Sequence, residues 1–279
     1  MSRWNDLNRR VRTALVLLPV ALLCVWAGGY AFLLLVAVAC IAVVIEWVTL
    51  CGHAGALPPF TFLMMVVIGT AAVCGAMQAP AIGLLLIVIG TVAAAIWGDR
   101  GIDPAFADPA RFRIDLAVGF PYLGLAAVAL PWLRSDPIVG LANTTFTLII
   151  VWASDIGAYL VGRLVGGAKL APEISPGKTW SGAAGGLACA ALAGLAAAAC
   201  LSSGYSPSHV IGLTIVLGII SQAGDLLESA LKRHFGVKDS GIIIPGHGGL
   251  LDRLDALLAV APVAALLAFT AGPGVVLWR

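Results

Sequence analysis

The sequence has little charge. Only 11% of its 279 residues are Asp, Glu, Lys or Arg, whereas 61% are hydrophobic and the mean hydropathy is +1.02. Soluble domains carry about a quarter charged residues, which excludes an ordinary soluble fold. A helix needs about 20 apolar residues to cross the hydrocarbon core, and the chain has about nine such stretches. The composition therefore predicts an integral membrane protein.

The sequence also lacks cysteine clusters. None of its six cysteines forms a C-x-x-C motif, and most of them lie within apolar runs. A disulfide or metal role would need clustering with other cysteines or with histidines, so we interpret them as packing residues. No signal-peptide cleavage site follows the basic segment 1–12. We therefore expect a retained anchor at this end.

The apolar runs and the residues that interrupt them predict an all-α integral membrane protein with about nine transmembrane helices. Gly28-Gly29 should make a tight turn, so that the first two helices form a hairpin. Several prolines fall at or near predicted helix ends, where a missing N–H does least harm: Pro58–Pro59, Pro80, Pro121, Pro131 and Pro207. The predicted helices cover residues 13–27, 30–50, 60–78, 81–98, 116–133, 143–162, 183–201, 209–230 and 254–271.

Lysines and arginines predict the orientation, because they are retained on the cytoplasmic side of a membrane. With a cytoplasmic N-terminus, all but two of the 16 basic residues lie on the inner side; Arg134 and Arg279 lie outside, as does the C-terminus. The inner segments are then 1–12, 51–59, 99–115, 163–182 and 231–253.

Ionisable residues concentrate in the second half of the chain. Residues 13–98 contain one acidic residue, Glu46, and no basic one. Glu46 lies a turn from the inner end of its predicted helix, where we expect its side chain to reach the interface. We therefore interpret 1–115 as membrane scaffold helices and 116–279 as the catalytic membrane domain.

One predicted membrane helix carries an acid well inside it. Ionisable groups within membrane spans are costly and usually face a cavity or a partner. Tyr159 and Arg163 follow Asp155 at helical spacing and share its face. That face is either part of a site or a structural contact between Asp155 and one of these side chains.

A second polar stripe runs along the helix at 209–230. Ser221, Asp225, Glu228, Ser229 and Lys232 lie on one face of an otherwise apolar segment. Two acids one turn apart would repel each other unless a cation lies beside them or protonation neutralises them. We expect this helix to face a polar cavity.

A glycine-rich loop follows. Gly246, Gly248 and Gly249 lie on the two sides of His247, and such glycines allow backbone N–H groups to approach phosphate. Asp252 and Asp255 begin the next predicted helix. Carboxylates from two helices suit Mg²⁺, which one or two carboxylates hold together with phosphates and water. Cations for a polyphosphate are supplied by Lys232, Arg233, Lys238 and Arg253.

A further anion site is possible at residues 173–186. Ser175, Lys178 and Thr179 stand just before a predicted helix, whose N-terminus favours anions. The segment is not a Walker A loop, because Pro172 occupies the position of the first glycine. The alternative is an ordinary capped helix start.

These motifs together resemble the signature of the phosphatidate cytidylyltransferases, also called CDP-diacylglycerol synthases. The resemblance is complete over Ser229–Asp255 and extends over roughly 150–260. It departs at Ser181, where the family often has Glu or Gln. The matching residues are Ser229, Leu231, Lys232, Arg233, Lys238, Asp239, Gly241, Ile244, Pro245, His247, Gly248, Gly249, Leu250, Asp252, Arg253, Leu254 and Asp255, and upstream Trp152, Asp155, Gly157, Ala158, Tyr159, Gly162, Arg163, Ser175, Pro176, Lys178, Thr179 and Trp180.

The resemblance implies Mg²⁺-dependent transfer of CMP from CTP to phosphatidic acid, giving CDP-diacylglycerol and pyrophosphate. It implies that Asp225 and Asp252 hold Mg²⁺, with Glu228 in support, and it leaves a second, monovalent cation open. We assign phosphate binding to Lys178, Lys232, Arg233 and Lys238. The expected substrate-binding residues are Ser175, Thr179, Ser229, His247, Gly248, Gly249, Arg253, Asp155 and Tyr159.

The expected setting is a bacterial inner membrane, with the active site facing the cytoplasm and membrane lipid around the chain. We expect no nucleic-acid partner, and the sequence leaves the oligomeric state open, a homodimer included. Two other functions are compatible with the same residues. One is an ion-coupled transporter, since intramembrane acids can form a cation path; the other is a related transferase acting on another lipid phosphate or a polyprenol.

Overall fold

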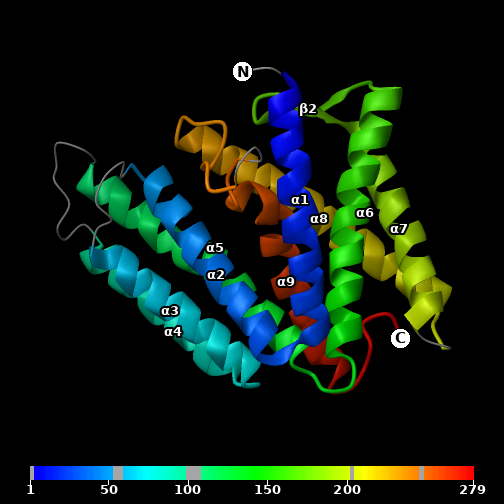
Figure 1. Ribbon diagram of the computed structural model, residues 1–279, viewed down its shortest axis with the longest axis horizontal. Coiled ribbons are helices and arrows are strands. Elements are labelled where there is room, and N and C mark those ends of the chain that lie inside the picture. The colour runs from blue at the N-terminus through cyan, green and yellow to red at the C-terminus, as the bar shows by residue number, and fades with distance from the viewer. Residues whose placement is uncertain (1–2, 53–58, 99–107, 202–203, 245–247) are drawn as a thin grey trace. The chain divides into compact units, whose positions relative to one another are not determined.

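A computed structural model of the protein describes residues 3–52, 59–98, 108–201, 204–244 and 248–279. Within these ranges it contains nine helices and one two-stranded sheet (Figure 1). The elements are α1 (Arg3–Ala27), α2 (Gly29–Leu50), α3 (Pro59–Ala76), α4 (Pro80–Trp97), α5 (Pro109–Arg134), α6 (Gly140–Val165), β1 (Lys169–Ala171), β2 (Ser175–Thr179), α7 (Trp180–Leu201), α8 (Pro207–His234) and α9 (Leu251–Ala271).

The all-α prediction is confirmed, since each of the nine predicted apolar segments forms a helix. Seven of these helices in the described part of the chain are long and apolar enough to cross a membrane. The other two, α1 and α3, contain shorter apolar stretches at Leu15–Ala27 and Phe60–Ala76. The orientation of the termini stays a prediction.

Prolines mark several helix starts, where a missing N–H removes no helical bond. Helices α3, α4, α5 and α8 all begin on one. Asp108 caps α5 by accepting a 3.0 Å hydrogen bond from the N–H of Ala110, so α5 begins seven residues before the predicted span at 116. The prediction that prolines lie near helix ends is therefore wrong for Pro121, which lies inside α5.

The sequence analysis did not predict the sheet. Strands β1 and β2 pair antiparallel, with Lys169 opposite Thr179 and Ala171 opposite Ser175. Proline, glycine and lysine in β2 are unusual for a strand, and a three-residue partner leaves no clear alternation to read. The hairpin nonetheless ends directly at α7, so Lys178 and Thr179 stand just before that helix as expected.

The chain folds as two compact units. The first unit comprises residues 1–135 and 234–254, and the second comprises residues 136–233 and 255–279. Helices α8 and α9 each contribute residues to both units, so the second half of the chain serves both. The two units reflect how the chain packs and do not show which part is catalytic. The predicted division into scaffold helices (1–115) and a catalytic domain (116–279) therefore stays a prediction.

In the first unit, α2, α3, α4 and α5 pack against one another. Large buried side chains such as Trp47, Met64 and Phe120 form the core. Glycines leave space for two of these side chains. A Cβ atom at Gly90 would overlap the ring of Phe120, and one at Gly119 would overlap the indole of Trp47. This close packing fixes the C-terminal end of α2 beside α5.

The predicted turn between the first two helices is present at Gly28, whose φ of 64° suits glycine. Figure 1 shows α1 and α2 diverging from this turn. Arg134 at the end of α5 donates hydrogen bonds to the carbonyls of Val25 (2.6 Å) and Trp26 (2.9 Å). The guanidinium thus supplies hydrogen-bond donors and positive charge to the last carbonyls of α1. These bonds give a structural reason why Arg134 lies outside the predicted inner segments that hold most of the basic residues.

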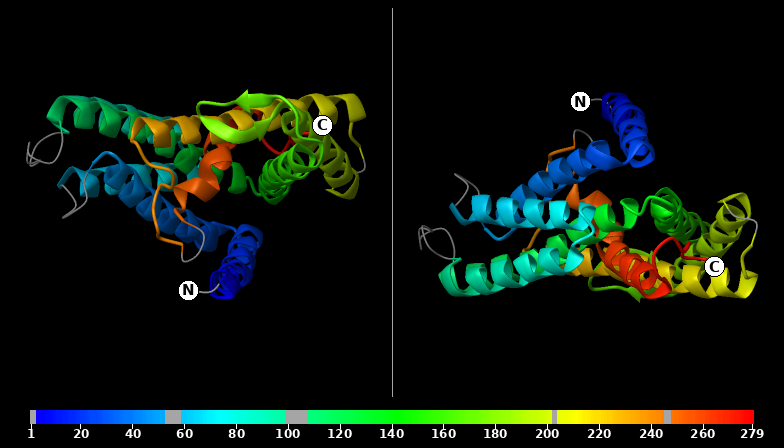
Figure 2. Two further views of the ribbon diagram at one scale, coloured as in Figure 1. Left: turned by 90° about the horizontal axis from the view of Figure 1, so that it is seen from above. Right: turned by 90° about the horizontal axis from the view of Figure 1, so that it is seen from below.

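In the second unit, α6 and α7 lie side by side (Figure 2). The C-terminal tail is also fixed here. Trp278 is fully buried and stacks on Phe146 with ring centroids 4.6 Å apart. Asn143 donates to the carbonyl of Val275 (3.2 Å) and accepts from the N–H of Leu277 (2.9 Å).

Asp136 adds a charged tie between the start of α6 and this tail. It accepts hydrogen bonds from the N–H groups of Ile138 (2.8 Å), Val139 (2.9 Å) and Gly274 (3.0 Å). Burial alone would raise the pKa of the Asp136 carboxyl, but these donors stabilise its charged form more and hold the pKa below the usual range.

We predict that Asp136→Asn destabilises the protein by about 1 kcal/mol, since it removes a charged acceptor from a partly solvated site. Because the folded-state pKa of Asp136 lies below the unfolded-state value of about 3.9, the ionised carboxylate stabilises the fold at any pH above that value. This stabilisation is lost as the pH falls through the folded-state pKa. Melting temperatures in detergent should differ between wild type and variant at neutral pH and converge in acid. A difference that grows in acid would contradict this.

Candidate active site

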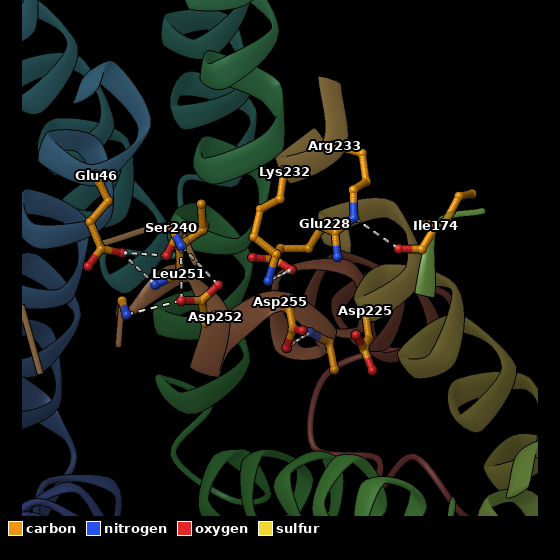
Figure 3. A network of polar contacts seen from close by, with 12 residues as sticks. Glu46, Ile174, Asp225, Glu228, Lys232, Arg233, Ser240, Leu251, Asp252 and Asp255 are labelled. Carbon is orange, nitrogen blue, oxygen red and sulfur yellow. Dashed lines mark hydrogen bonds and ion pairs between the residues drawn. The ribbon is translucent and has the colours of Figure 1, made fainter. Parts of the chain in front are cut away.

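Three carboxylates of the second unit come together with one lysine. Asp155 on α6, Asp225 on α8 and Asp255 on α9 interact electrostatically with one another and with Lys178 on β2. Asp155 is exposed on the isolated chain, and Asp225 and Asp255 are half-buried. Two of the three, Asp225 and Asp255, are drawn in Figure 3. We call these four residues the acidic cluster.

The ammonium of Lys178 lies 2.7 Å from the carboxylate of Asp225. Both side chains remain partly accessible, at 24% for Lys178 and 37% for Asp225. Two residues predicted as metal ligand and phosphate ligand are thus ion-paired to each other. With its carboxyls ionised, the acidic cluster carries more negative than positive charge, and in a membrane this favours an added cation.

Asp255 was not predicted as a functional residue, although its position one turn after Asp252 was noted. The structure places it in the acidic cluster, and its Oδ1 also accepts a 2.7 Å hydrogen bond from the N–H of Ala256. The spacing of Asp252 and Asp255 on one helix could have indicated both residues. The sequence alone did not decide which of them meets the other acids.

The hairpin positions Lys178 through its attachment to α7. The hydroxyl of Thr179 accepts a 3.1 Å hydrogen bond from the N–H of Gly182 and so caps α7. Ser181 donates to the carbonyl of Gly166, where α6 ends, and its hydroxyl lies 3.0 Å from that of Thr179. Ser181, the residue that departs from the family pattern, therefore joins the two ends of the α6–α7 connection.

Two basic residues of α8, Lys232 and Arg233, have partners within the second unit (Figure 3). The ammonium of Lys232 lies 2.7 Å from the carboxylate of Glu228, whose side chain is only 2% exposed. Arg233 donates to the carbonyl of Ile174 at 3.3 Å, which ties α8 to the hairpin. Lys232 thus compensates Glu228 locally, and the proposed roles of Glu228 at a metal and of Lys232 and Arg233 at phosphate stay predictions.

In the first unit, Asp252 fixes the loop that precedes α9. Its carboxylate accepts hydrogen bonds from the N–H of Ser240 (3.1 and 3.2 Å to its two oxygens) and from the N–H of Gly249 (3.0 Å). The bond from Gly249 connects the Asp252 side chain to the backbone just before α9 begins. The N–H of Gly249, which we expected to face phosphate, is therefore bonded to Asp252 here.

The expectation for Glu46 is wrong. Its side chain does not reach the interface, because Glu46 is only 2% exposed. It accepts hydrogen bonds from the N–H groups of Leu250 (2.8 Å) and Leu251 (2.7 Å) at the start of α9. Nothing in the sequence near Glu46 indicates partners 204 and 205 positions away.

The remaining predicted residues fall in both units. In the second unit, Ser175 lies in β2, Ser229 lies on α8, and Tyr159 accepts a 2.7 Å hydrogen bond from Arg163. The first unit holds Lys238, Gly248 and Arg253. His247 lies outside the described residues. Asp225 and Asp252 belong to different units, so their joint role at a metal stays a prediction.

The donor set fits Mg²⁺. No group of three His, Cys, Asp or Glu side chains among the described residues is arranged to hold a metal ion by itself. Mg²⁺ is usually held by one or two carboxylates, with substrate phosphates and water completing its shell, and the acidic cluster offers hard carboxylate oxygens with an excess of negative charge. The residues therefore suit a Mg²⁺ ion whose remaining ligands are water or substrate phosphate.

We predict that Lys232→Met destabilises the protein by about 3 kcal/mol, because it leaves the buried Glu228 carboxylate without this cation. The double variant Glu228→Gln/Lys232→Met should recover most of that loss, since it removes both charges. Melting temperatures of the three purified proteins in one detergent test this. A double variant as unstable as the single one would show that the pair is not the source of the effect.

Comparisons with known proteins identify proteins of similar sequence. Residues 8–271 match the model of the cytidylyltransferase family. Proteins called phosphatidate cytidylyltransferase from Brucella suis biovar 1 (strain 1330) and Brucella abortus (strain 2308) are each 37% identical over 261 residues, covering 92% of this chain and 91% of theirs. One of the same name from Staphylococcus saprophyticus is 44% identical over 163 residues, covering 58% of this chain and 60% of its own.

Proposed function

Because this chain belongs to the cytidylyltransferase family, we propose that it is a phosphatidate cytidylyltransferase that makes CDP-diacylglycerol. The observation that carries this proposal is the acidic cluster, in which Lys178 is paired with Asp225 within a helical membrane protein. The signature segment Ser229–Asp255 adjoins it in sequence.

The chemistry requires no protein nucleophile. A phosphate oxygen of phosphatidic acid attacks the α-phosphorus of CTP, a new P–O bond forms, and the bond from the α-phosphorus to the bridging oxygen breaks. Pyrophosphate leaves with the electron pair of that bond. The protein must therefore align the two substrates and neutralise their charge.

The residues supply both of these needs. Asp225 and Asp252 would hold Mg²⁺, with Glu228 in support, and the bound metal would neutralise phosphate charge. Lys178 would exchange its contact with Asp225 for a phosphate oxygen when CTP arrives, because an ammonium can follow the stronger anion. Further phosphate contacts would come from Lys232, Arg233 and Lys238.

The substrates define the setting. CTP would arrive from the cytoplasm, and phosphatidic acid would reach the site laterally from the bilayer. The relatives are bacterial, so we place the protein in the cytoplasmic membrane. The asymmetry of lysine and arginine supports a cytoplasm-facing site.

One assay tests this function against its rivals. The purified protein is incubated in detergent–lipid micelles with labelled CTP, Mg²⁺ and phosphatidic acid, and lipid product and pyrophosphate are measured. We expect CDP-diacylglycerol and pyrophosphate in equal amounts. Turnover only with a polyprenyl phosphate would favour the related transferase, and no CTP turnover with any lipid would favour a transporter.

We predict that Asp225→Asn and Asp252→Asn each lower the rate at least about 100-fold, because each removes a charged metal ligand. Asp108→Asn is the matched control, since Asn caps a helix as well as Asp does, and it should retain wild-type activity. Elution volume and melting temperature verify folding. A folded Asp225→Asn or Asp252→Asn protein with near-normal turnover would contradict the metal assignment.

A further inference from the structure

The C-terminal end of α2 holds the segment 234–251 at two places, both within the first unit. Glu46 contacts the end of this segment, and its neighbour Trp47 contacts the beginning. The segment forms the larger part of the signature Ser229–Asp255 and leads directly into Asp252. An N-terminal helix therefore determines where this part of the signature lies.

At the end of the segment, Glu46 acts on the start of α9. Its two carboxylate oxygens each accept one hydrogen bond, from the N–H groups of Leu250 and Leu251. These N–H groups have no helical partner, and a negative charge at a helix N-terminus is favourable. The bonds are short and charge-assisted, and they hold the first turn of α9, which carries Asp252.

Ser240 connects Glu46 to Asp252. Its hydroxyl lies 3.3 Å from Oε2 of Glu46, and its N–H donates to the carboxylate of Asp252 (Figure 3). Gly241 and Gly249 let the backbone approach: a Cβ atom at either would lie within 3.0 Å of a Glu46 oxygen. The described backbone at Gly241 and Gly249 therefore lies against the Glu46 carboxylate, and the N–H groups of Ser240 and Gly249 hold Asp252.

At the beginning of the segment, Trp47 packs against Phe235, with an edge-on ring contact at 5.8 Å. The indole N–H of Trp47 donates to the carbonyl of Asp115 on α5 at 3.1 Å. Arg111 donates to the carbonyl of His234 at 3.0 Å, and His234 lies 3.3 Å from the Asp115 carboxylate. This end of the segment is thus attached to α2 and α5 together.

We propose that Glu46 is a positioning residue for the metal-dependent reaction, and that it acts by holding the start of α9 so that Asp252 meets the metal in the right place. Trp47 supports it by fixing the other end of the segment. The inference rests on the proposed function for the role of Asp252. It assigns a function to a helix that the sequence suggested was scaffold alone.

The effect should appear in metal affinity because Mg²⁺ requires near-ideal octahedral geometry. Glu46→Gln keeps the shape of the side chain but presents an NH₂ group to one of the two N–H donors. The first turn of α9 then loses a charged acceptor, and Asp252 is held only by its bonds from Ser240 and Gly249. Changes in residues that orient metal ligands typically cost about 10- to 100-fold in metal affinity or activity.

The test compares Glu46→Gln with wild type and with Asp108→Asn, a control at an exposed acid whose helix-capping role Asn retains. Initial rates of CDP-diacylglycerol formation are measured over a range of Mg²⁺ concentrations. We expect the half-saturating Mg²⁺ concentration to rise about tenfold or more in Glu46→Gln and to stay unchanged in Asp108→Asn. Glu46→Asp, which keeps the charge, should lie between wild type and Glu46→Gln.

A purely structural role would lower the amount of active enzyme, and hence the maximal rate, without moving the half-saturating Mg²⁺ concentration. An unchanged Mg²⁺ dependence in Glu46→Gln therefore overturns the proposal. If Glu46→Gln does not fold, Ser240→Ala replaces it. That variant removes one bond to Glu46 and should shift the Mg²⁺ dependence in the same direction by a smaller factor; no shift would again overturn the proposal.

Hydrogen exchange of the metal-free proteins gives a readout that does not require activity. The peptide covering 240–251 should exchange faster in Glu46→Gln than in wild type, while peptides from α6 and α7 exchange as before. Equal exchange at 240–251 would contradict the hold of Glu46 on this loop. A wild-type protein that makes no CDP-diacylglycerol would refute the proposed function instead, and the exchange result would still decide whether Glu46 fixes the loop.

Discussion

The compensation of negative charge inside a membrane protein is the constraint on which the rest of this structure depends. A carboxylate removed from water must find donors, a cation or a proton. Glu46 finds the N–H groups at the start of α9, and Glu228 finds the ammonium of Lys232. Asp155, Asp225 and Asp255 gather around Lys178 with an excess of negative charge. The first two carboxylates hold parts of the fold together, whereas the acidic cluster is suited to a further cation.

We propose that this difference separates structural acids from those of the active site. A carboxylate that is hydrogen-bonded or ion-paired to fixed partners stabilises the folded state, because it holds a loop or a helix end in place. Where several carboxylates share one flexible lysine, the site can exchange that lysine for a metal and phosphate. The hairpin β1–β2 holds Lys178 at this site. Thr179 and Ser181 attach the end of the hairpin to α6 and α7. The base of Lys178 is thus fixed by the hairpin, and its ammonium is ion-paired with Asp225.

The sequence predicted the helices well because apolar runs of this length have few alternatives in a membrane. It also indicated Asp155, Lys178 and Asp225, since a charge within an apolar helix or at a helix start is visible locally. It missed the role of Asp255 and the hairpin. Asp255 acquires its neighbours from other elements, and the short strand β2 carries residues that are rare in strands.

Glu46 shows the limit of local reasoning most clearly. Its position near a helix end favours an interfacial side chain, and only the tertiary fold brings the start of α9 to it. The proline at position 121 makes the same point for secondary structure, because the Asp108 cap and Pro109 start α5 earlier than the apolar run does. Long-range partners and caps outside an apolar run must be seen in the structure.

The most direct test of this account is metal binding by the protein without substrates. Mn²⁺ can replace Mg²⁺ as a spectroscopic probe, because both prefer oxygen ligands, and the loss of free Mn²⁺ signal on titration with purified protein measures binding. We expect saturable binding by the wild-type protein and binding at least about tenfold weaker in Asp225→Asn. Equal binding by the two proteins would contradict the central claim that the acidic cluster attracts the metal.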